Sequence, residues 1–348
     1  MGMDHIKVLK RAWEMTWRYR ALWIFGVILA LTTARGWGGG GGNGNQAQYR
    51  INGEDLPWSG REFELPHIPP NVTSILIAAG VGLACGIVIL IVVTTIARYV
   101  AETALIQMVD DYEDTGEKRN IRGGFRLGWS RTAFRLFLIK LLTSLPVAVA
   151  FILLFALSLS PLLLWVTESS VARIVGTVAA IGLFFMVLFL AILVAAAISL
   201  LLKFFWRACA LEEMGVIESI RQGFGLVRQR LKDVGIMWLI MVGVQIGWVL
   251  AMIAMVIVLF PAIILLIILG GVLGGLPALL TGGLISLLFE GPVPWVVGAL
   301  VGLPIFILVV ATPWLFLGGL MEVFKSIVWT LTYRELHTLE GLETEIRG

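Results

Sequence analysis

The chain has 348 residues, of which 59% are hydrophobic and 14% charged, with a mean hydropathy of +0.94 and a formal net charge of +3. Soluble domains carry roughly a quarter charged residues, so this composition excludes an ordinary soluble globular protein and indicates an all-α integral membrane protein. The alternating segments of ~10 residues typical of a membrane β-barrel are absent. The small charge, with cations near the ends of apolar runs, argues against nucleic acid and for membrane lipids as partners.

The chain begins with a basic, amphipathic segment that leads into an apolar run over residues 17–34. Only 14 residues separate Arg20 from Arg35, and at 1.5 Å per residue a helix of this length falls short of the ~30 Å hydrocarbon core. Aromatic rings are favoured at the membrane interface, so Trp17, Tyr19 and Trp37 extend this first expected span to interfacial depth.

A polar outer loop is expected over residues 35–71, before a second span over 72–97. The loop contains five consecutive glycines over 38–42, a composition that specifies no fold. It lacks the strand and helix that flank a phosphate-binding glycine motif. Two interpretations remain: a loosely structured connector, or an ordered cap that contacts a partner through its later aromatic residues.

Four further apolar runs cover residues 134–166, 174–202, 234–259 and 295–320, which gives six expected transmembrane helices. The segments between them are asymmetric in charge, because 22 of the 26 Lys and Arg residues fall on one side of this scheme. Cationic segments stay in the cytoplasm. The sequence therefore predicts a multi-pass protein of a bacterial inner membrane with its N- and C-termini cytoplasmic.

Residues 261–294 form another apolar stretch, rich in glycine, interrupted by Pro277 and charged only at Glu290. A full additional span would move the C-terminal arm to the outer side. We therefore expect a re-entrant or interfacial hairpin whose backbone is shielded by protein, since unpaired peptide groups cannot face lipid.

A short signature recurs before three of the apolar stretches: a bulky apolar residue, a cation, any residue, Ala or Gly, and an aromatic. The copies lie at 9–13, 125–129 and 220–224, and such recurrence indicates repeated units. The expected architecture is three helical hairpins, each preceded by an amphipathic interfacial helix: a first unit over 1–97, a second over 120–207, a third over 216–334 and a cytoplasmic tail over 335–348.

Each copy places apolar residues at helical spacing with cations around them, as in helices that lie in the headgroup plane. These helices are either plain anchors that fix topology or a functional cytoplasmic face. The small residue before the aromatic allows close approach to a neighbouring span. The lipid-interface candidates are Lys10, Trp13, Trp17, Arg126, Trp129, Arg221 and Phe224.

Three features carry a resemblance: the amphipathic lead-in with paired spans, the turn over 208–215 and the closing segment 332–336. In these features the chain resembles a bacterial family that includes the integral membrane domain of some glycerophosphodiester phosphodiesterases and uncharacterised stand-alone relatives. The resemblance implies six spans in three hairpins. The catalytic domain of those phosphodiesterases has no counterpart in this sequence, so the resemblance implies no phosphodiesterase activity.

Candidate chemistry is sparse. Cys85 and Cys209 fit no metal spacing, the three histidines are far apart, and the acidic run over 102–117 is accompanied by basic neighbours. We expect no catalytic, cofactor-binding or metal-binding residues. Pairs of glycines four residues apart permit close helix contact, within one subunit or between subunits; these helix-packing candidates are Gly82, Gly86, Gly243, Gly247, Gly298 and Gly302.

The function that these patterns favour is a non-enzymatic integral membrane subunit or scaffold that interacts with lipid and with a membrane-protein partner or a second copy. The alternative is a transporter or channel-like protein gated by the 261–294 hairpin, although no ionisable residue lies near the middle of an expected span. A lipid-headgroup enzyme ranks third, since Glu102 with Glu212 or Glu322 would be its only plausible acids.

Overall fold

The computed structural model describes residues 3–33, 70–167, 169–287 and 293–347; for residues 70–80, 83 and 342–347 it describes the backbone alone. These residues are almost entirely helical, and no strand occurs among them. The elements are α1 (His5–Arg18), α2 (Ala21–Thr33), α3 (Pro70–Thr115), α4 (Ile121–Gly128), α5 (Arg131–Ser158), η2 (Ser160–Val166), α6 (Ser170–Leu211), α7 (Val216–Gln229), α8 (Leu231–Val258), α9 (Phe260–Ser286) and α10 (Val293–Arg347). The outer loop, His67 and Glu290 lie outside the described residues.

Six helices in the described part of the chain are long and apolar enough to cross a membrane: α3, α5, α6, α8, α9 and α10. The expected all-α membrane fold is therefore confirmed. The set of helices long enough to cross a membrane differs from the expected set. α2 has only 13 residues and is too short to cross, whereas α9 is long enough.

The apolar run over 17–34 is divided between two helices. α1 ends at Arg18, where the Tyr19 N–H still donates to the Met15 carbonyl. The Tyr19 side chain is buried and donates its hydroxyl hydrogen bond to the Arg119 carbonyl at 2.9 Å. Burial raises the pKa of this phenol. Tyr19 thus anchors the junction inside the protein, and it does not extend a span toward the interface as we had expected.

The stretch over 261–294 also departs from the expected re-entrant or interfacial hairpin. α9 is one continuous helix of 27 residues that contains Pro277. Proline removes one backbone donor from a helix, and the Pro277 carbonyl accepts a hydrogen bond from the Thr281 hydroxyl at 2.7 Å. Leu259 alone separates α8 from α9, and Pro261 follows in the first turn, where a missing N–H costs nothing.

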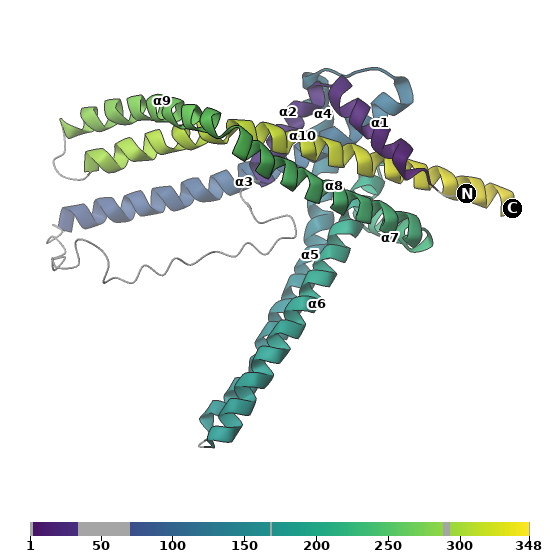
Figure 1. The fold of residues 1–348 in the computed structure, drawn as a ribbon, viewed down its shortest axis with the longest axis horizontal. Coiled ribbons are helices and arrows are strands. Elements are labelled where there is room, and N and C mark those ends of the chain that lie inside the picture. The colour runs from purple at the N-terminus through teal and green to yellow at the C-terminus, as the bar shows by residue number, and fades with distance from the viewer. Residues whose placement is uncertain (1–2, 34–69, 168, 288–292, 348) are drawn as a thin grey trace.

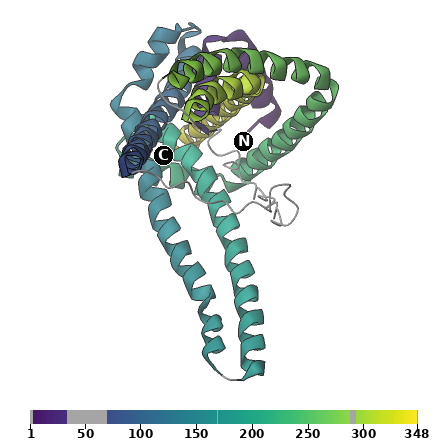
Figure 2. The same cartoon turned by 90° about the vertical axis from the view of Figure 1, so that its left-hand side faces the viewer.

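The long helices converge on one region and extend from it in different directions (Figure 1). The α5–α6 hairpin extends in one direction, while α3 and the paired α9 and early α10 extend in another (Figure 1, Figure 2). The buried side chains concentrate where they meet. We call this region the basal core: α1, α4 and α7 together with residues 99–109 of α3, 202–210 of α6 and 320–336 of α10.

The basal core has a cyclic order. The inner ends of α3, α6 and α10 contact one another. α4 packs against α3 and α7 against α6, in each case the long helix that precedes it in the chain, and α1 packs against α10, the last helix. The three expected units would therefore be interlocked, since each short helix covers the end of a long helix from another expected unit.

The third unit breaks this regularity. α2 packs between α10 and α3, and α5 between α3 and α6, whereas α8 packs closely along neither α6 nor α10. Its buried side chains, Val234, Met237 and Met241, all lie in its first three turns. α10 instead pairs with α9.

Candidate functional site

The signature residues have similar burial in the three copies, although the second copy lies at the end of α4, with Trp129 just beyond it. The small residue is buried each time, as Ala12, Gly128 and Gly223. A Cβ added at Gly128 would lie 2.3 Å from the Val100 carbonyl oxygen, and one at Gly223 would lie 2.7 Å from a Phe205 ring atom. The small side chains therefore allow the short helices to lie directly on the long ones.

The aromatic that follows points outward. Trp13 is 54% exposed, Trp129 73% and Phe224 50%. Trp17 is exposed as well, beside Trp13 at a ring separation of 5.8 Å. The three signature cations Lys10, Arg126 and Arg221 are also exposed. Each short helix thus has one face in the basal core and a second, basic and aromatic face turned away from it.

Ion pairs tie the ends of the chain to α3. Arg334 of α10 bridges Asp110 and Asp114, one turn apart on α3. Arg11 of α1 contacts Glu113 at 2.9 Å, which raises the pKa of Arg11. Residue 4 also lies against α10, since the Asp4 N–H donates to a Glu335 carboxylate oxygen at 3.4 Å. The N-terminal arm and the end of α10 are therefore neighbours.

Glu212, at the end of α6, is the centre of a second polar group. Its carboxylate accepts from the Tyr333 hydroxyl and from the Gln222 amide, the latter at 2.5 Å. His337 Nε2 lies 3.5 Å from the same carboxylate, and its ring stacks on Tyr333. Because these partners occupy both oxygens, Glu212 joins α6, α7 and α10 structurally and is poorly placed for proton transfer to a substrate.

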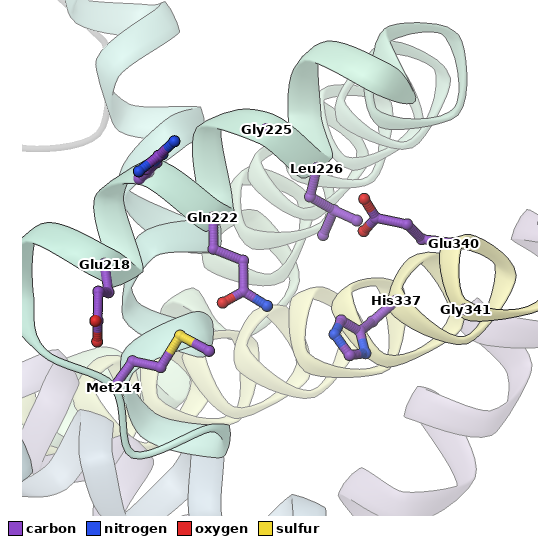
Figure 3. Close-up of a pocket in the computed structure, with 9 residues that line it drawn as sticks. Met214, Glu218, Gln222, Gly225, Leu226, His337, Glu340 and Gly341 are labelled. Atoms are coloured by element: carbon purple, nitrogen blue, oxygen red, sulfur yellow. The ribbon is translucent and has the colours of Figure 1, made fainter. Parts of the chain in front are cut away.

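An open groove of about 650 Å³ lies beside this group, between α7 and the end of α10. Figure 3 shows side chains from both helices around the space, with Gln222 and Leu226 on α7 facing His337 and Glu340 on α10. Arg221 and Glu218 complete its charged lining. One of the three signature cations therefore borders the groove.

A third charged group lies where α3, α6 and α10 meet. Glu102 of α3 interacts electrostatically with Arg207 and Lys203 of α6 and with Glu322 of α10. The sequence placed Glu102 with Glu322 as possible enzyme acids, and the structure brings the two near each other. Arg207 and Lys203 are functional candidates that the sequence analysis did not select. Their signal was a pair of cations four residues apart within an otherwise apolar helix.

The predicted packing glycines behave differently from pair to pair. A Cβ at Gly302 would lie 2.5 Å from the Gly274 carbonyl oxygen, and one at Gly298 2.6 Å from that of Ala278, so both face α9. No described atom lies within 4 Å of the corresponding positions at Gly243 and Gly247 on α8, nor at Gly82 and Gly86 on α3.

The residues that carry most metal and redox chemistry are scattered. Within the described ranges, no group of three or more His, Cys, Asp or Glu side chains is arranged to hold a metal ion. Cys85 is exposed and Cys209 buried, and neither forms a disulfide in this part of the structure.

The fold and the basal core define a class: a multi-pass α-helical membrane protein whose long apolar helices are fastened at one end by short amphipathic ones. Within that class, the chain belongs to the family of unknown function DUF7544, whose model matches residues 3–339. The chain matches no curated protein and no solved structure.

Proposed function

We propose that the protein is a non-enzymatic integral membrane subunit of a bacterial inner membrane, a scaffold that binds lipid and a membrane-protein partner or a second copy through its apolar helices. The basal core would lie at the cytoplasmic surface with both termini. The concentration of Lys and Arg on α1, α4, α7 and the basal-core ends of α3, α6 and α10 supports this orientation.

The observation that carries the proposal is the exposure of the apolar helices. Only 6% of the residues in the most apolar stretches of α5, α6 and α8 are buried. A helix that is apolar on all sides belongs in a membrane or against another protein. The basal core fixes the positions of these helices, and their apolar surfaces remain available to lipid or to a partner protein.

The carrier alternative receives less support. It requires a mobile hairpin over 261–294, but α9 packs tightly on α10 through Gly274 and Gly302. Gln245, a polar residue that could have lined a central path, is exposed along α8.

We expect the partner to contact α8, the helix that packs least within the chain. The double substitution Gly243→Leu with Gly247→Leu adds bulk to an open face, where no described atom is displaced. Small residues at helix interfaces permit close approach between helices in membranes, so this variant should lose its partner while keeping its fold.

The test is purification of the full-length protein in mild detergent, with light scattering for mass and identification of co-purifying proteins. Wild type should be heavier than its 38.1 kDa monomer, and the α8 variant should approach that mass. Gly182→Leu, at an equally open position on α6, is the matched control and should retain the assembly. A monomeric wild type, or equal loss in the control, would contradict the proposal.

A further inference from the structure

Arg207 is a charged side chain buried among apolar neighbours. It is 2% exposed, and its two terminal nitrogens donate to the Lys203 and Ser326 carbonyls at 2.7 and 3.0 Å. Its Nε has no hydrogen-bond partner, and neither does the buried Ser326 hydroxyl. No carboxylate of the described residues forms an ion pair with it within 4 Å. A buried guanidinium whose hydrogen bonds go only to neutral groups is costly, and Glu102 interacts with Arg207 without a direct ion pair.

The surroundings of Arg207 carry an excess of positive charge. Lys203 and Arg98 lie close enough to interact with Glu102, as Arg207 does. The second carboxylate of the group, Glu322, is held by Lys325 at 3.2 Å. Four cations thus lie around only two carboxylates, Glu102 and Glu322, and Glu322 is already paired with Lys325.

This charged cluster, defined as Arg98, Glu102, Lys203, Arg207, Glu322 and Lys325, lies at the boundary between the apolar helices and the basal core. Val93 and Ile96, within two turns of Arg98 on the outward side of α3, are exposed apolar residues. Glu102, Lys203 and Lys325 are half-buried, so part of the surface of each side chain is exposed. Basic clusters between helices on the cytoplasmic side of a membrane suit lipid headgroups.

We propose that the charged cluster binds the phosphate of an anionic phospholipid, with the acyl chains lying along the exposed apolar face of α3. The inference deepens the proposed function and rests on its placing of the basal core at the cytoplasmic membrane surface. A lipid is favoured over free phosphate because charged and apolar surfaces adjoin at this point. Arg207 supplies a fixed charge, and the amines of Lys203, which lies over the Trp329 ring, and Lys325, which pairs with Glu322, supply further donors.

The test is titration of dioleoyl phosphatidylglycerol into the detergent-purified full-length protein, followed by native mass spectrometry. Lys203→Gln with Lys325→Gln should weaken binding roughly tenfold to thirtyfold, since each cation near an anionic lipid contributes about a factor of five. Arg228→Gln with Lys232→Gln removes two exposed cations outside the cluster and should change affinity less than about twofold. Equal loss in the two variants would show general surface attraction and overturn the proposal.

Two further arms separate lipid from other ligands. Dioleoyl phosphatidylcholine should bind at least about tenfold more weakly, and inorganic phosphate at millimolar concentration should not displace phosphatidylglycerol. Displacement by phosphate, or equal binding of both lipids, would overturn the lipid assignment.

A second variant covers the case in which the double substitution fails to fold. Glu102→Gln removes a competing negative charge, so phosphatidylglycerol should bind about threefold to tenfold more tightly; unchanged or weaker binding would contradict the site. This result is independent of partner retention by the α8 variants, so the failure of one proposal does not imply failure of the other.

Discussion

At the scale of single residues, the recurring signature has two roles in adjacent positions. The small residue is buried against a long helix, and the following aromatic is exposed. The sequence indicated close approach at the small residue, and the geometry at Gly128 and Gly223 agrees with it. It did not indicate the partner, because a local pattern carries no information about which of several long helices lies opposite.

Gly128 offers a direct test of this contact. Gly128→Ala should lower the free energy of unfolding by about 1–3 kcal/mol, because the new methyl group would collide with the backbone oxygen of Val100, which cannot move aside alone. The measurement is a denaturant titration or a thermal melt in detergent.

The control is Gly123→Ala on the same helix, where the new Cβ would lie 3.8 Å from the nearest described side-chain atom. This change should be neutral or stabilise by up to about 1 kcal/mol through helix propensity. If both substitutions have the same effect, α4 does not lie against α3 as described.

At the scale of whole elements, α2 and α9 mark the limit of the sequence analysis. Apolar composition identified both segments, but not their lengths. α9 continues as a helix through Pro277, and Gly270 and Gly274 in the preceding turns lie against α10. Those tertiary contacts override the local tendency of proline and glycine to interrupt a helix.

The attachment of α10 to α3 depends on Arg334. Its side chain is 30% exposed and pairs with two carboxylates, so Arg334→Ala should cost about 1–3 kcal/mol of unfolding free energy, since charged hydrogen bonds are lost and two like charges remain.

Arg11→Ala is the comparison for this ion pair. Arg11 is 47% exposed and pairs with one carboxylate, and exposed pairs contribute only about 0–1 kcal/mol. Both effects can be read from thermal melts at low and high salt. If Arg11→Ala lowered the stability more than Arg334→Ala, then α1, and not α10, would provide the main attachment to α3.

At the scale of the whole molecule, the interlocked units constrain topology. α1 lies against α10, so we expect the N-terminal arm and the end of the chain on one side of any membrane. Single cysteines can test this in a background with Cys85 and Cys209 replaced by Ala. With a membrane-impermeant maleimide, Lys7→Cys and Thr338→Cys should react only in inverted vesicles, and Arg173→Cys, at the far end of the α5–α6 hairpin, only in intact cells.

Labelling of Lys7→Cys and Thr338→Cys from opposite sides would contradict both the orientation and the packing of α1 on α10. The same experiment addresses the sequence analysis, whose charge count predicted this arrangement without any knowledge of contacts. The count can be made from the sequence because charge near helix ends is a local property. The position of α8 is not local, and no pattern in residues 231–258 distinguishes it from the better-packed α5.

The packing of the first helix on the last also affects biosynthesis. About 300 residues separate α1 from its site on α10, so at roughly 5–20 residues per second the ribosome needs ~15–60 s to produce the missing surface. During that interval the buried face of α1, with Val8 and Met15, has no permanent cover. The nascent chain can complete the basal core only near the end of translation, when α10 has been made. Insertion of the early helices into the bilayer must therefore precede their final packing.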